Sequence, residues 1–203
     1  ASSGGGLHNE SSPTLVGCKF LNNKAESGGA VYIKVNFSNP KFLNCLIANN
    51  FATGNSGGAL AFDDSSLNTH TLLLNCTLYG NTSNSGLNLR IPTGELIIQN
   101  CILWDNGLRS RYAYGKIRVT KSLVDGNITN LSWGDVSYTD LIPRDNVTTE
   151  MLFVDAANGN FKPKLGGPAI GSGDNSLYEN GDGNANNNHL LTDKDFAGKS
   201  RLN

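Results

Sequence analysis

The residues of this chain best suited to acid–base chemistry are four acids close to its apolar segments, Asp63, Asp64, Asp105 and Asp125. Paired carboxylates cleave glycosidic bonds, and acids that bind calcium beside a basic residue can serve the cleavage of acidic glycans. The basic residues that could act as base or stabilise charge are Arg90, Lys116 and Arg118. Because the acids do not recur at one position of the repeat described below, we interpret them as scattered turn residues, with a polysaccharide lyase or hydrolase built on Asp63, Asp64 and Asp105 as the alternative.

The three histidines are His8, His70 and His189, and they share no position of the repeat with one another. No Ser/His/Asp triad or metal cluster can therefore be assembled from them. His70 lies in the longest loop between a Gly-rich opening and a cysteine, and loops of this kind often carry binding residues. We take His70 as a candidate ligand-binding residue, with an ordinary surface histidine as the alternative.

Two aromatic residues, Tyr79 and Trp104, each stand three places after a cysteine. If they face outward from adjacent coils, their rings form a platform on which a sugar could stack. The same position in the earlier repeats holds Leu21 and Ala48, which are apolar. The alternative is therefore a face that is buried beneath the C-terminal region.

A calcium loop is conceivable at Asp182, Asn184 and Asn186, where oxygen-bearing side chains alternate. The segment lacks the distal bidentate glutamate of such loops, so an ordinary solvated loop is the favoured interpretation. The sequence accordingly predicts no cofactor, with calcium as the alternative.

An internal repeat must position all of these residues. Each copy opens with Ser-Gly, as at Ser27-Gly28-Gly29 and Ser56-Gly57-Gly58, and then closes a short apolar run on a cysteine. The cysteines are Cys18, Cys45, Cys76 and Cys101, with Ser122 in the fifth copy. Five residues after them stand Asn23, Asn50, Asn81, Asn106 and Asn127.

Stacking such units buries their apolar edges in one continuous core, as in solenoid proteins. The sequence therefore predicts an all-β fold, a right-handed parallel β-helix of about five repeats over residues 1–127. Its asparagines should form a ladder, since Asn tolerates left-handed corners and its amide can bond the coils above and below. Residues 128–203, rich in Gly, Asn, Asp and Pro, should form an irregular C-terminal cap on the same solenoid.

The four cysteines are predicted to be buried free thiols. Stacked cysteines keep a Cβ separation near the strand spacing of about 4.8 Å, which exceeds the roughly 3.8 Å that a disulfide prefers. Ligands arranged along one line also cannot surround zinc as a tetrahedron.

Composition narrows the class of partner. The net charge is −1, from 16 basic and 17 acidic residues without charge runs, which disfavours nucleic acid and anionic membranes as partners. No stretch of the sequence is apolar enough to span a membrane. The chain opens in mid-repeat at Ser3-Gly4-Gly5, so we expect a fragment whose leader is missing.

The Gly-Gly-Ala-Leu openings and the stretches 75–81 (Asn-Cys-Thr-Leu-Tyr-Gly-Asn) and 100–106 resemble right-handed parallel β-helix surface proteins. They are similar in particular to Bacteroidetes proteins with a choice-of-anchor Q region and to polymorphic outer-membrane protein repeats. The segments 152–161 and 167–173 resemble the ending of those proteins, although Gly171 replaces an aspartate usual there. The resemblance implies a secreted or cell-surface protein, associated with the outer membrane.

These observations favour a non-catalytic protein whose rigid β-helix presents surfaces for adhesion or for binding a glycan or a host protein. The alternative is a polysaccharide lyase or glycoside hydrolase acting on acidic glycans. An enzyme of that kind should carry two or more carboxylates within about 10 Å of one another in a groove, whereas a binding scaffold need not.

Overall fold

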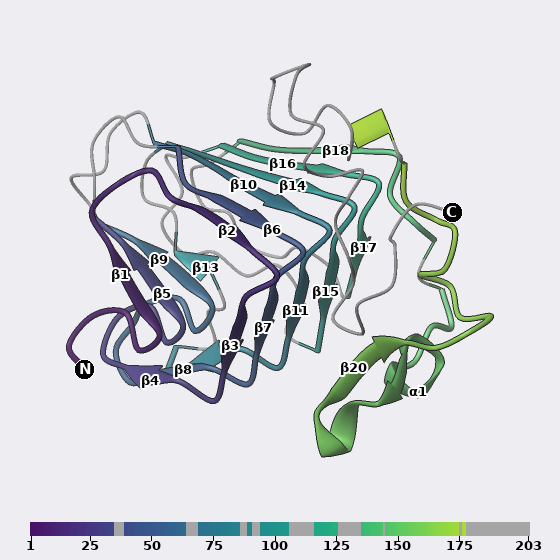
Figure 1. Cartoon of the computed structure of the whole chain (residues 1–203), viewed down its shortest axis with the longest axis horizontal. Helices are drawn as coiled ribbons and strands as arrows, with labels where there is room; N and C mark the ends of the chain where they lie inside the picture. The colour runs from purple at the N-terminus through teal and green to yellow at the C-terminus, as the bar shows by residue number, and fades with distance from the viewer. Residues whose placement is uncertain are drawn as a thin grey trace.

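The structure is a computed structural model, and it describes residues 1–34, 39–63, 69–85, 89–90, 94–105, 116–125, 135–143, 145–174 and 176–177. Short parallel strands stack into four sheets that surround one core, so the predicted parallel β-helix is confirmed (Figure 1). The described residues contain no helix long and apolar enough to cross a membrane.

Each of the first three coils contributes one strand to each of the four sheets in turn. Sheet I contains β1 (Leu7–Asn9), β5 (Val31–Ile33), β9 (Leu60–Phe62) and β13 (Leu89–Arg90). Sheet II contains β2 (Thr14–Val16), β6 (Lys41–Leu43), β10 (His70–Leu74), β14 (Glu95–Gln99), β16 (Lys116–Thr120) and β18 (Asp135–Thr139). Sheet III contains β3 (Lys19–Leu21), β7 (Leu46–Ala48), β11 (Thr77–Tyr79), β15 (Ile102–Trp104) and β17 (Leu123–Val124). Sheet IV contains β4 (Lys24–Ala25), β8 (Phe51–Ala52) and β12 (Thr82–Ser83).

The apolar columns of the repeat form the core. Because successive side chains of a strand point to opposite faces, one column per strand faces inward. In sheet II the inward column is Leu15, Phe42, Leu73, Ile98 and Val119, paired rung by rung. In sheet III it is Phe20, Ile47, Leu78, Leu103 and Val124.

The Ser-Gly-Gly openings are explained by close backbone contact between coils. A Cβ atom on Gly29 would lie 2.5 Å from the carbonyl oxygen of Gly58, and one on Gly58 would lie 2.2 Å from that of Thr82. Only glycine fits where one backbone passes this near another.

The cysteines stack as predicted and all four are free thiols. The backbone N–H of Cys45 donates to Sγ of Cys76 at 3.4 Å, and that of Cys76 donates to Sγ of Cys101 at 3.3 Å. Ser122 continues the column, because its Oγ accepts from the N–H of Cys101 at 3.0 Å. Cys18, however, is half-buried rather than buried, which corrects the expectation of four buried thiols.

Asn23, Asn50 and Asn81 form a hydrogen-bonded ladder across three coils. Oδ1 of Asn50 accepts from both the backbone N–H and the side-chain amide of Asn23, each at 2.9 Å. Oδ1 of Asn81 accepts in the same way from Asn50. The ladder residues do not take the left-handed corner, which is a correction: the residue before each one does so, with φ of 55° at Asn22, 56° at Asn49 and 58° at Gly80. Asn106 and Asn127 lie outside the described residues.

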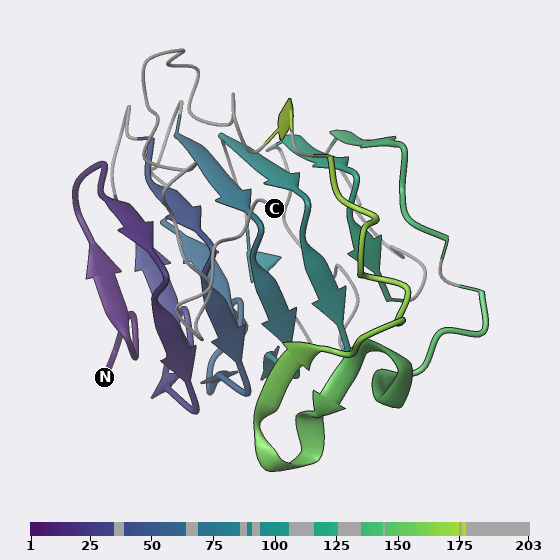
Figure 2. The ribbon, with the colours of Figure 1, turned by 45° about the vertical axis from the view of Figure 1, so that its right-hand side comes forward.

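The C-terminal region covers the outer face of sheet III. It consists of α1 (Thr149–Leu152), β19 (Phe153–Asp155), a 3₁₀ turn (Ala156–Asn158) and β20 (Asn160–Pro163), with β19 and β20 antiparallel (Figure 2). Leu152, Phe153 and Phe161 are buried against the outward side chains of sheet III. Sheet II also extends into the segment 128–203, since β18 pairs in parallel with β16.

Candidate functional site

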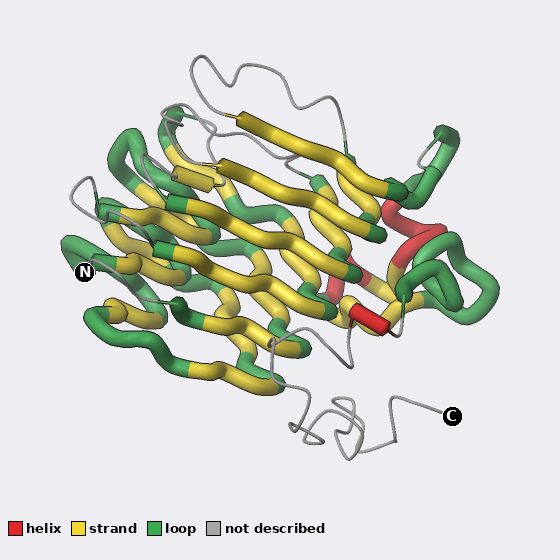
Figure 3. The backbone as a smooth tube through the Cα atoms, turned by 90° about the horizontal axis from the view of Figure 1, so that it is seen from above, coloured by secondary structure: helices red, strands yellow, loops and turns green. Residues whose placement is uncertain are grey.

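The outer face of sheet II gathers the charged side chains that sequence reasoning had considered separately. Its strands lie side by side across one surface of the molecule (Figure 3). His70 of β10, Glu95 of β14 and Lys116 of β16 occupy the same position on three successive rungs. Their inward neighbours Thr71, Leu96 and Ile117 are buried, so these three side chains project outward. Together with Arg118 we call them the charged row.

Glu95 is the centre of the charged row. Its Oε2 lies 3.6 Å from Nε2 of His70, and its Oε1 accepts from Nε of Arg118. The Glu95 side chain is only 15% exposed, whereas those of His70 and Arg118 are 53% and 56% exposed. The Glu95 carboxylate therefore lies close to the sheet, whereas the side chains of His70 and Arg118 are exposed to solvent.

This arrangement presents hydrogen-bond donors to an incoming anion. A guanidinium binds carboxylates well because its N–H groups form a planar fork, and Lys116 adds an exposed ammonium in the neighbouring position. Exposed ion pairs contribute only about 0–1 kcal/mol to stability.

Apolar side chains border the charged row. The next outward position holds Lys41, Leu72, Ile97 and Arg118 on successive rungs. Leu72 is buried and Ile97 is half-buried. They pack with Leu43 and Leu74 in a small apolar cluster on the outer face of sheet II.

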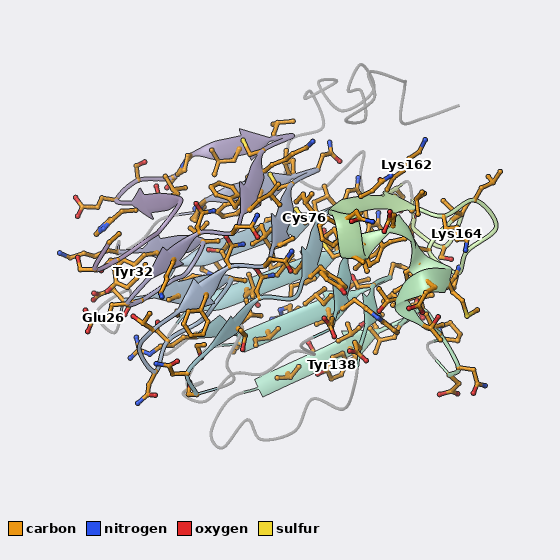
Figure 4. All side chains as sticks on the ribbon, turned by 90° about the horizontal axis from the view of Figure 1, so that it is seen from below. Glu26, Tyr32, Cys76, Tyr138, Lys162 and Lys164 are labelled. Atoms are coloured by element: carbon orange, nitrogen blue, oxygen red, sulfur yellow. The ribbon has the colours of Figure 1, made fainter. Side chains whose placement is uncertain are left out.

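Asp63 lies on a different face, beside sheet I. Its Oδ2 accepts from the hydroxyl of Tyr32 at 2.6 Å, and the ring of Tyr32 meets that of His8 edge to face with centroids 5.2 Å apart. Arg90 of β13 donates to the carbonyl oxygen of Phe62 at 3.2 Å. Tyr32 lies at the N-terminal end of the solenoid, well separated from Lys162 in the C-terminal region (Figure 4). Asp64 lies outside the described residues.

The aromatic pair Tyr79 and Trp104 is covered by the C-terminal region, so an open platform is not what the structure shows. Trp104 is 7% exposed, and its Nε1 donates to Oγ1 of Thr149 at 3.1 Å. The ring of Tyr79 packs against Phe153 and Phe161, with centroids 5.7 and 4.9 Å away. The alternative interpretation, a buried apolar face, is the arrangement observed.

Asp105 takes part in holding that covered face together. Burial, followed by the nearby charge of Asp105, raises the pKa of Tyr79. The backbone N–H of Asp105 donates to Oδ2 of Asp125 at 3.1 Å. Both acids therefore have structural hydrogen bonds at the end of β15.

No group of three or more His, Cys, Asp or Glu side chains that could hold a metal ion occurs among the residues that the structure describes. The calcium candidates Asp182, Asn184 and Asn186 lie outside the described residues, as does His189.

Glu95 is the site residue that sequence reasoning missed. The signal was present, because His70, Glu95 and Lys116 each stand six places before the cysteine or serine of their coil. The histidines share no position with one another, but His70 shares its position with an acid and a base. Extending the cysteine-based alignment six residues upstream recovers the charged row.

No family model, no curated protein and no solved structure matches this chain.

Proposed function

We propose that this chain is a non-catalytic module of a secreted or cell-surface protein, and that it binds an acidic glycan on the outer face of sheet II. The observation that carries the proposal is Glu95, which holds His70 and Arg118 on either side of itself beside the exposed Lys116. A carboxylate-bearing sugar can accept hydrogen bonds from these donors.

The proposal assigns binding rather than catalysis because the carboxylate of Glu95 already has two partners, His70 and Arg118. Asp135 of β18 occupies the same position on the rung beyond Lys116. Glycoside hydrolysis requires a second carboxylate placed across the scissile bond. A polysaccharide lyase or hydrolase is the competing function, and the experiment below distinguishes it by turnover.

The surface location is supported by sequence resemblance. The repeat and the ending resemble those of β-helix surface proteins with a choice-of-anchor Q region, as in Bacteroidetes, and a rigid solenoid suits adhesion because it keeps a binding face in a fixed orientation. We extend the proposal to adhesion on this basis.

The test compares binding of immobilised acidic and neutral polysaccharides to the wild-type chain and to the double variant Lys116→Gln/Arg118→Gln. Each charge-assisted hydrogen bond contributes about 1.5–3 kcal/mol, so the double variant should bind the acidic polymer at least about tenfold more weakly. Lys162→Gln, which removes an exposed charge from β20, is the matched control and should bind as the wild type does.

Release of reducing ends or unsaturated uronates is measured on the same polymers. Binding without product, weakened only in the double variant, supports the proposal. Product formation would replace it with the enzyme, and equal binding by all three proteins would exclude sheet II as the site.

A further inference from the structure

The charged row alternates in sign along the solenoid axis. His70, Glu95 and Lys116 follow one another on successive rungs, with Asp135 on the rung beyond, so a cation when protonated, an anion and a cation lie on one line across the strands and an acidic residue follows them. Parallel strands are about 4.8 Å apart, which places His70 and Lys116 about 10 Å from each other. The donors of this line are thus two rungs apart, with a carboxylate midway.

A linear glycan that lies along this line advances by about one sugar per rung, on the order of 5 Å. Its carboxylates meet donors at both His70 and Lys116 if they occur on every second sugar, and also if they occur on every sugar. The intervening sugar then lies over Glu95, where hydroxyl or amide N–H groups can donate to the carboxylate.

We propose that the charged row selects acidic glycans carrying one carboxylate per disaccharide over those carrying one on every sugar. This inference rests on the proposed function and specifies its ligand class. In a polymer of uronic acid alone, the middle sugar brings its carboxylate over Glu95. Like charges that face each other at this distance repel, and such repulsion is a general source of specificity.

Glu95 is a suitable discriminator because it cannot readily turn away. Arg118 holds one of its oxygens and His70 lies beside the other, and the side chain is largely buried. Arg118 offsets part of the charge of Glu95, but it stands two residues along β16 from Lys116 and so lies beside the line of the three alternating charges. The discrimination between the two classes of glycan therefore depends on where Glu95 lies in the row as well as on the net charge of the site.

The test measures binding of two soluble polymers of matched length, hyaluronan with one carboxylate per disaccharide and polygalacturonate with one per sugar. Wild-type protein should prefer hyaluronan by about tenfold or more, the difference that a single unfavourable pair of like charges can make. Glu95→Gln should bring the preference below about threefold, chiefly by strengthening polygalacturonate binding. Glu10→Gln, an exposed acid beside sheet I, is the control and should keep the wild-type preference.

The outcomes separate the two proposals. Equal wild-type binding of both polymers, or a preference unchanged in Glu95→Gln, overturns the selectivity while leaving acidic-glycan binding intact. Failure of the wild type to bind either polymer overturns the proposed function itself. A second variant, Lys116→Gln, keeps the proposal testable if Glu95→Gln misfolds. It should weaken the binding of hyaluronan without strengthening that of polygalacturonate. The opposite result would contradict the alternating arrangement.

Discussion

The indole Nε1 of Trp104 donates a hydrogen bond to Oγ1 of Thr149 at 3.1 Å, which joins sheet III to a segment 45 residues further along the chain. Around this bond Tyr79, Phe153 and Phe161 pack edge to face. The C-terminal region is therefore attached by an aromatic cluster.

Replacing Trp104 by alanine should detach that region. Removing a buried tryptophan costs about 3–5 kcal/mol, and most of this loss falls on the contact between sheet III and residues 149–163. Hydrogen–deuterium exchange of Phe153–Pro163 should accelerate by about 100-fold or more, because local opening becomes easier by that free energy. Val154→Ala, at an exposed position of β19, should leave exchange nearly unchanged. Equal exchange in Trp104→Ala and the wild type would show that the region is held by other contacts.

Replacing Asn50 by leucine should destabilise the solenoid strongly. The substitution keeps a side chain branched at Cγ but leaves the backbone N–H and the side-chain amide of Asn23 without their acceptor. Each buried polar group left unpaired costs about 1–3 kcal/mol, so the free energy of unfolding should fall by about 3 kcal/mol or more. Urea unfolding measures the change. Asn39→Leu, an exposed position, is the control, and a similar loss in both variants would argue against a stabilising ladder.

The thiols should differ in reactivity along their column. The hydrogen bond with the Cys76 thiol and then burial raise the pKa of Cys45, and burial raises that of Cys76. Since the thiolate is the reactive form, iodoacetamide at pH 8 should modify half-buried Cys18 first and the others only after unfolding. Mass spectrometry of native and denatured, unreduced protein checks this. Fewer than four modified cysteines after denaturation would mean that a disulfide exists.

The raised pKa values of Cys45 and Cys76 should make the free energy of unfolding depend on pH. A thiol whose pKa is raised in the folded state stays protonated there after the unfolded chain has begun to ionise. Above the ordinary thiol value of 9.0 the unfolded state therefore binds fewer protons, and the free energy of unfolding should fall as pH rises. Urea unfolding at pH 8 and pH 10 measures the fall, and Cys76→Ser should reduce it.

The core could be predicted from the sequence because each copy of the repeat has two positions that can be aligned, that of the cysteine and that of the asparagine. The cysteine sets the register of sheets II and III, so Phe42 could be matched to Leu73 and Ile47 to Leu78 without a structure. The asparagine ladder followed from the same alignment. The shift of the left-handed corner to Asn22 and Asn49 was not predicted, because φ depends on how the chain turns between two strands.

The candidate site was harder to predict. The segment between the Gly-rich opening and the cysteine differs in length from coil to coil, so residues near its middle have no fixed alignment to either end. Asp63 meets Tyr32 diagonally between coils, because it stands two residues beyond Ala61, the strand partner of Tyr32. Glu95 could have been aligned with His70 and Lys116, but its contact with Arg118 depends on side chains reaching diagonally between rungs.

The hydrogen bonds of the asparagine ladder all run the same way, from the amide of Asn23 to Asn50 and from that of Asn50 to Asn81. The side-chain dipoles consequently align head to tail, as peptide dipoles do in a helix. A coil added upside down would set amide N–H against amide N–H. Each folded coil therefore presents ladder groups that can bond the next coil in one orientation only. The coils of the solenoid consequently assemble with a fixed direction.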